Sequence, residues 1–197
     1  IVHAHAPACV AYACMRLVPD SSCARAYEEK LGDIAGSQYA LPGSLKLGGI
    51  VMKGFEKGSR AVMMDNHGAT VGAEDMQSAL AKYETLDYLC RTLFHARALG
   101  GVKTPQKKIC LAQSNYPVKE FSADDKSVRE DAVKFIKRAY ANGLVGSGWG
   151  TLAVKDGDGI IFNADDCSPL DLSESDLVRY SDGYVSSEKK IERIGTF

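Results

Sequence analysis

The chain has 197 residues, of which 45% are hydrophobic and 25% are charged, and this balance is typical of a soluble globular protein. Its formal net charge is -1, and lysine and arginine are spread along the sequence among acidic residues, which excludes nucleic acid as an expected partner. No run of roughly eighteen apolar residues and no signal-peptide pattern is present, so we expect no membrane span.

The six cysteines show neither a C-x-x-C pair nor the regular spacing of a disulfide framework. In a chain long enough to bury a core, such cysteines are typically reduced and packed as small apolar residues. We therefore expect free thiols and a cytoplasmic location.

Residues 1–5 alternate apolar and polar positions, which predicts a strand. Because the chain starts inside this pattern, we expect it to be a piece of a longer protein. Pro7 opens a predicted helix, and the apolar run at residues 8–15 predicts that this helix is buried all round. A short strand is expected at residues 39–41 and a short helix at residues 47–55.

The apolar run at residues 61–64 predicts a buried strand that ends in a turn at residues 65–68. A second strand is expected at residues 69–72. Residues 73–98 then predict a long helix, because apolar positions keep helical spacing, acids occupy the first turn and glycines follow the end.

A second organised region begins with another amphipathic helix, which a glycine-rich stretch at residues 143–150 terminates. Two strands, at residues 151–155 and 160–163, flank the sequence Asp-Gly-Asp-Gly, which indicates a hairpin. Residues 172–178 predict a helix of one or two turns, with Ser173 as its N-cap.

Three of the four histidines form a candidate metal site. His3 and His5 stand two residues apart in the predicted strand, so their side chains leave the same face with roots about 6–7 Å apart. His67 follows another strand and precedes Gly68, which permits close backbone approach. Three neutral imidazoles that leave one position open are a ligand set of catalytic zinc. The alternative is that these three histidines only hydrogen-bond the backbone. The fourth histidine, His95, lies late in the long helix, where a positive charge suits the helix dipole, and we expect it to have a structural role.

The sequence His3-Ala4-His5-Ala6-Pro7-Ala8, the turn Asp65-Asn66-His67-Gly68 and the alanine-rich long helix together resemble class II aldolase/adducin domains. They are similar to the C-terminal half of such a domain. The second region, with its helix, glycine-rich turn and hairpin, is similar to the N-terminal half.

The resemblance divides the chain into three parts. Residues 1–105 correspond to a C-terminal half with the histidine site, residues 106–122 to a linker, and residues 123–197 to an N-terminal half. This order is the reverse of the order in the family. The chain is therefore either the middle of a tandem protein or a circular permutant, and we favour the tandem arrangement.

The resemblance implies an α/β fold with three α/β/α layers around a mainly antiparallel sheet. It implies that His3, His5 and His67 hold zinc or another divalent metal, and that the protein is a lyase or epimerase of the aldolase type. Its substrate would be a small sugar, with or without a phosphate group, converted through a metal-stabilised enediolate. A homo-oligomer is also implied.

Two features of the family's active site are altered or absent. The glutamate that serves as general acid/base would lie in a segment after residue 197, and Glu188 and Glu192 do not match its position, so no catalytic residue is assigned. The family's phosphate turn corresponds to a stretch with Gly148, Gly150 and Thr151, which are the candidate substrate-binding residues.

Two changes weaken the expected phosphate site. Thr151 replaces an asparagine and Ala153 replaces a serine of the family's turn, and Asp165 and Asp166 in a second turn would repel a phosphate. These changes support a second hypothesis, in which the chain is a non-catalytic, adducin-like scaffold or cytoskeletal protein with a vestigial metal site.

Overall fold

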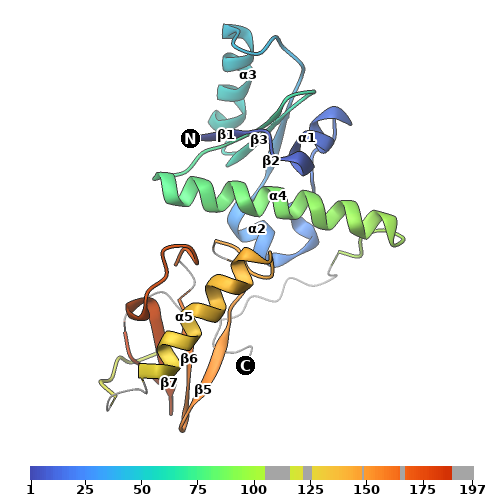
Figure 1. Cartoon of the computed structure of the whole chain (residues 1–197). Coiled ribbons are helices and arrows are strands. Elements are labelled where there is room, and N and C mark those ends of the chain that lie inside the picture. Colours follow the sequence, from blue (N-terminus) through green and yellow to red (C-terminus); the bar gives the residue numbers. More distant parts are fainter. Residues whose placement is uncertain (105–115, 122–125, 148, 165–166, 188–197) are drawn as a thin grey trace. The chain divides into compact units, whose positions relative to one another are not determined.

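The computed structural model describes residues 1–104, 116–121, 126–147, 149–164 and 167–187. The chain divides into two compact units, Ile1–Ile109 and Cys110–Phe197, which are described separately. Both units contain helices and strands (Figure 1), so the predicted α/β class is confirmed. None of the helices in the described ranges is long and apolar enough to cross a membrane.

Unit 1 contains, in chain order, β1 (Val2–Ala4), α1 (Pro7–Cys14), η1 (Ser21–Cys23), α2 (Arg25–Leu31), β2 (Ile34–Ser37), α3 (Leu45–Glu56), β3 (Ala61–Met64), β4 (Gly68–Val71) and α4 (Met76–Ala98). Local sequence signals explain where the helices begin. Pro7 occupies the first turn of α1. The Ser44 hydroxyl accepts a hydrogen bond from the Leu47 amide at 3.2 Å and caps α3. The Asp75 carboxylate likewise accepts from the Ser78 amide at 2.7 Å and caps α4.

The four strands among residues 1–104 form one sheet in the order β1-β4-β3-β2. The β1–β4 and β3–β4 pairs are antiparallel, whereas β2 runs parallel to β3. The sheet is therefore mixed, because the chain passes through α3 between β2 and β3 and returns in the same direction.

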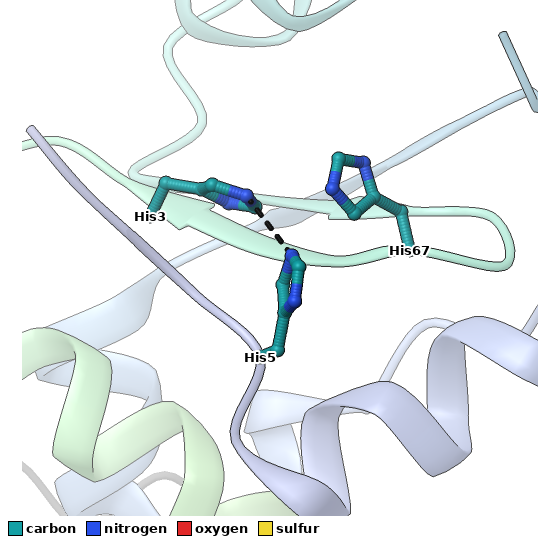
Figure 2. A group of neighbouring side chains, drawn as sticks. All are labelled: His3, His5 and His67. Carbon is teal, nitrogen blue, oxygen red and sulfur yellow. Dashed lines mark hydrogen bonds between the residues drawn. The ribbon is translucent and has the colours of Figure 1, made fainter. Parts of the chain in front are cut away.

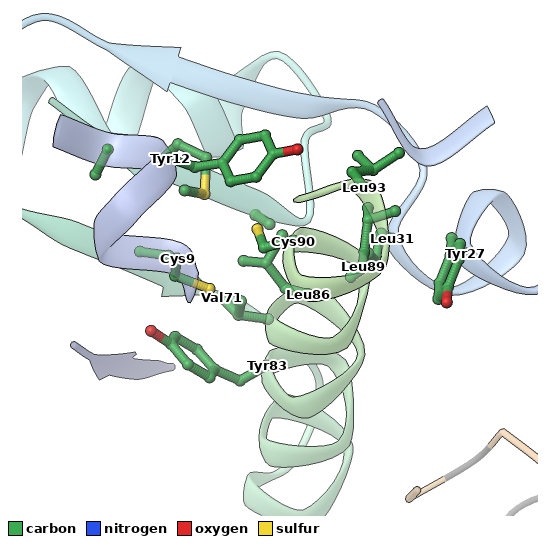
Figure 3. Packing of buried hydrophobic residues seen from close by; sticks show 14 residues of the cluster. Cys9, Tyr12, Tyr27, Leu31, Val71, Tyr83, Leu86, Leu89, Cys90 and Leu93 are labelled. Atoms are coloured by element: carbon green, nitrogen blue, oxygen red, sulfur yellow. The ribbon is translucent and has the colours of Figure 1, made fainter. Parts of the chain in front are cut away.

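The core of unit 1 lies between the long helix α4, the helices α1 and α2, and the sheet. Figure 3 shows Leu86 and Cys90 of α4 close to Cys9 and Tyr12 of α1, and all four side chains are buried. Every residue of β3 is buried, and alternate side chains pack against different helices. The Met63 side chain belongs to this core, while α3 packs against the neighbouring residues of the strand.

Three local expectations for the fold are wrong. The strand is β2, at Ile34–Ser37, and not at residues 39–41, because pairing with β3 decides its position. Helix α1 is buried on one face only, since Ala11 and Cys14 are exposed. Residues 172–178 form one 3₁₀ turn followed by a strand, and not a helix.

Unit 2 contains α5 (Lys126–Ala141), β5 (Ala153–Asp156), β6 (Gly159–Asn163), η2 (Glu174–Asp176), β7 (Leu177–Ser181) and β8 (Tyr184–Val185). In the described part of this unit, β5 to β8 form an antiparallel sheet in sequence order. Ser173 is the N-cap residue of η2 and forms a capping box with Asp176: the Ser173 amide and hydroxyl donate to the Asp176 carboxylate at 2.8 and 2.7 Å. The 3₁₀ turn η2 ends at Asp176, because the following residues form β7 and pair with β6.

An ion cluster around the largely buried Arg179 side chain holds the β5–β6 hairpin to β7. The Arg179 guanidinium lies 2.8 Å from the carboxylates of both Asp156 and Asp158. Gly157, with φ of 58°, supplies the left-handed residue that this two-residue turn requires. The hairpin expected from the Asp-Gly-Asp-Gly sequence is therefore present, with its strands shifted by one or two residues.

Candidate metal centre

The three candidate histidines come from two segments that the β1–β4 pairing brings together. His3 lies in β1 opposite Thr70 of β4, and His5 lies one residue beyond the end of β1. His67 is the last residue of the turn between β3 and β4. Figure 2 shows the three imidazole rings pointing toward one another from these positions.

The ring nitrogens are gathered at distances suited to a shared cation. Ring centroids of the three pairs are separated by 5.0, 4.9 and 4.8 Å. The Nε2 atoms of His3 and His5 are 3.2 Å apart, close to the ~3.3 Å expected for two nitrogens on a tetrahedral zinc ion. One ligand atom from each of the three residues lies within 4.8 Å of the other two.

A backbone carbonyl sets the orientation and tautomer of His3. Its Nδ1 lies 2.9 Å from the Ala69 carbonyl oxygen, which can only accept a hydrogen bond. The Nδ1 atom therefore carries the proton, and the Nε2 atom presents a lone pair toward His5. Metal-binding histidines are commonly held in this way by an outer acceptor.

His67 is the most enclosed of the three histidines. Its Nδ1 atom is buried and has no hydrogen-bond partner among the described residues. Burial, followed by the neighbouring His3 and His5, lowers the pKa of His67. A lowered pKa favours the neutral imidazole, which is the form that binds metals.

The chemistry of the donor set fits zinc better than calcium or magnesium. In the described part of the chain the cluster consists of three histidines and includes no carboxylate or thiol. Imidazole nitrogens suit zinc and similar transition metals, whereas calcium and magnesium prefer oxygen ligands. His3 and His5 are exposed, so the centre is open on one side to a further ligand.

The turn that presents His67 is tied to the end of α1. Asn66 adopts φ of 55°, a left-handed conformation that asparagine tolerates. Its amide donates to the Ala13 carbonyl at 2.9 Å, and the Arg16 Nε donates to its side-chain oxygen at 3.3 Å. The turn sequence indicated the loop, but nothing in the sequence pattern indicated these two contacts.

Gly68 lies where the segment of His67 approaches that of His5. A Cβ atom at this position would lie 2.8 Å from the Ala4 carbonyl oxygen and 2.9 Å from the Cδ2 atom of His5. No side chain fits there without displacing β1 or the His5 ring. The close approach inferred from the sequence is therefore a steric requirement for glycine.

The candidate substrate-binding residues lie in unit 2. Gly148 is outside the described residues, as are Asp165, Asp166, Glu188 and Glu192. Gly150 adopts φ of 83°, and a Cβ there would lie 2.7 Å from the Val145 side chain, so the turn itself requires glycine. The Thr151 hydroxyl is buried and has no hydrogen-bond partner among the described residues.

Within the described ranges, the remaining histidine and the cysteines take no part in the cluster. His95 is exposed near the end of α4, with its ring 5.6 Å from that of Phe94. The cysteines within the described ranges are all free thiols, namely Cys9, Cys14, Cys23, Cys90 and Cys167. Cys110 lies outside those ranges.

In comparisons with known proteins, residues 1–94 match the family model described as the Class II Aldolase and Adducin N-terminal domain. Eight solved chains also match. One is an L-fuculose 1-phosphate aldolase, with 28% identity and a TM-score of 0.48. That match covers 53% of this chain and 49% of the aldolase, so it spans about half the length of that protein. No curated protein sequence matched the chain.

Proposed function

We propose that the chain is part of a zinc-dependent aldolase or epimerase, because residues 1–94 match the family model of the class II aldolases and adducins. His3, His5 and His67 are the proposed metal ligands, and zinc or another divalent cation is the proposed cofactor. The proposed substrate is a small sugar, with or without a phosphate group. The reaction would be the cleavage or epimerisation of that sugar, and its place would be the cytoplasm.

The observation that carries this proposal is the convergence of three imidazoles from two distant segments. His3 and His5 approach to 3.2 Å between Nε2 atoms, and His67 completes the group. Three titratable rings around one point repel one another whenever more than one of them is protonated. A shared cation turns this repulsion into attraction.

The chemical role of the chain's residues follows from their protonation states. When bound, a divalent ion supplies Lewis acidity, which stabilises negative charge on substrate oxygens. The Ala69 carbonyl keeps the proton of His3 on Nδ1 and leaves Nε2 free to donate its lone pair. The burial of His67 lowers the pKa of that ring, which favours its neutral form. The exposure of His3 and His5 leaves room for a sugar to reach the centre.

Substrate recognition and assembly form the less direct part of the proposal. Gly148, Gly150 and Thr151 stay the candidate substrate contacts, and the Thr151 hydroxyl has no hydrogen-bond partner among the described residues. For the complete domain we propose three α/β/α layers. This is supported by β3, which packs against α1 with one face and against α3 with the other. A homo-oligomer would cover the open centre.

A second candidate function is that of a non-catalytic, adducin-like scaffold or cytoskeletal partner that has kept the metal site. The sequence of the glycine-rich turn favours it, because Ala153 lacks the hydroxyl that the family's serine provides. The requirement for Gly150 in the turn also has a purely conformational explanation.

Elemental analysis of the purified 197-residue chain tests the metal site. We expect about one zinc per chain, loss of zinc in His67→Ala, and retention in His95→Ala, which removes an exposed histidine outside the cluster. A chain without stoichiometric zinc, whose thermal stability also does not respond to a chelator, would rule out the enzyme. Turnover of any member of a panel of ketoses and ketose phosphates by the zinc-loaded chain would then favour the aldolase over the scaffold.

A further inference from the structure

We infer that Tyr83 is a positioning residue for the metal centre, because its hydroxyl binds the carbonyl oxygen of the peptide group between Ala4 and His5. This inference rests on the proposed metal site. It concerns a residue of α4 that contributes no ligand and lies 79 positions away from the carbonyl oxygen it contacts.

The contact itself is short and enclosed. The Tyr83 hydroxyl donates a hydrogen bond of 2.6 Å to the Ala4 carbonyl oxygen. Only 5% of Tyr83 is exposed, and its ring packs in the core of unit 1 (Figure 3). Burial, followed by the nearby Cys9, raises the pKa of Tyr83. The phenol therefore stays protonated at neutral pH and remains a donor.

The position of Ala4 explains why the bond matters for His5. Ala4 is the last residue of β1 and pairs with Ala69, so the ladder with β4 holds His3 but ends before His5. The next regular element begins at Pro7. Between these points the Tyr83 hydroxyl fixes the direction of the Ala4 carbonyl. The orientation of that peptide plane sets the direction in which the His5 side chain leaves the backbone.

Gly68, which has no side chain, leaves open the space that the same carbonyl occupies. The position of its missing Cβ lies 2.8 Å from the Ala4 oxygen and 2.9 Å from the His5 ring. The carbonyl is thus held by a hydrogen bond from α4, in a space that a side chain at position 68 of β4 would fill. Preorganised ligands bind a metal more tightly than mobile ones, because less conformational freedom is lost on binding.

Tyr12 offers a matched control within the same core. It is also a buried tyrosine, 3% exposed, and its hydroxyl has no hydrogen-bond partner among the described residues. Tyr12→Phe and Tyr83→Phe remove the same atom from the same core and keep both rings. Only Tyr83→Phe releases the Ala4 carbonyl.

The test compares the full 197-residue wild-type chain with these two variants, each taken as the folded fraction from gel filtration. Zinc dissociation constants are measured by competition with a chromophoric chelator, and cobalt(II) absorption spectra report the geometry of the site. We expect Tyr83→Phe to bind zinc about tenfold more weakly, the lower end of the effect of losing an outer-shell partner, with an altered cobalt spectrum. Tyr12→Phe should match the wild type in both measurements.

A purely structural role for Tyr83 would lower the melting temperature of the metal-free protein and leave the zinc affinity and cobalt spectrum equal to those of Tyr12→Phe. That result would overturn the inference while the proposed function stands. A wild-type chain that binds no zinc would overturn both. Weaker zinc binding confined to Tyr83→Phe supports both.

Discussion

Replacing Gly68 by alanine tests whether the spacing of the histidine segments controls metal binding. The new methyl group would lie 2.8 Å from the Ala4 oxygen and 2.9 Å from the His5 ring. Ordinary contact begins at 3.4 Å, so β1 or the His5 ring must retreat by about 0.5–0.6 Å. Zinc sites tolerate about ±0.2 Å in their ligand distances. The required movement therefore exceeds the tolerance of the site.

We expect two measurable consequences of Gly68→Ala. The zinc dissociation constant should rise by about tenfold or more, because the ligands leave their favoured positions. The free energy of unfolding of the metal-free protein should fall by about 1–3 kcal/mol, the usual cost of adding a methyl group to a filled space. Competition titration with a chelator measures the first effect and urea denaturation the second.

Gly49→Ala is the matched control for this substitution. Gly49 lies in α3, and a Cβ there would meet no atom within 4 Å. The same methyl group should leave zinc affinity unchanged and raise helix stability by roughly 0.5–1 kcal/mol. If Gly68→Ala binds zinc as tightly as Gly49→Ala does, the steric account of the site is wrong.

Three further predictions address the rest of the molecule. Ser44→Ala should reduce the unfolding free energy of unit 1 by about 1 kcal/mol in urea denaturation, since the Leu47 amide loses its cap; an unchanged value would contradict the capping role. Arg179→Met should lower the unfolding free energy of unit 2 by about 3–5 kcal/mol in urea denaturation, because Asp156 is left as a largely buried charge without its partner. An unchanged unfolding free energy would contradict the role of this ion pair, and the zinc affinity should stay the same. The pKa of His67 is lowered from 6.5, so the unfolded chain gains a proton before the folded chain does. Metal-free protein should therefore lose stability as the pH falls below 6.5, in urea titrations at a series of pH values, and His67→Ala should reduce that loss.

Strong local patterns made part of the fold predictable. The apolar run of β3 was placed at the observed residues, 61–64, because a strand buried on both faces is apolar throughout. α4 has its long apolar periodicity, and its start was misplaced by three residues because Asp75 caps the helix and does not belong to its first turn. β2 and α2 were missed, since residues 20–48 carry no clear period. β2 exists because it pairs with β3, and such pairing is not visible in local sequence.

The same division between local and long-range information applies to the candidate site. The spacing of His3 and His5 and the turn around His67 suggested a shared centre, and the structure brings these rings together. The Ala69 carbonyl that orients His3 and the Tyr83 hydroxyl that holds Ala4 were not foreseen. Both contacts depend on how β4 and α4 dock against β1, and neither residue type marks such a role by itself.

The antiparallel pairing of β1 with β4 has a consequence for how the protein matures. The His3 ring meets the Ala69 carbonyl across 66 positions of sequence, so the complete ligand set exists only after this long loop has closed. Contacts of such sequence separation form late, because closing a long loop costs entropy before it is rewarded. Occupancy of the proposed metal site would therefore report chain closure, and zinc at a hundred times its dissociation constant would favour the closed chain by about 2.7 kcal/mol through mass action alone.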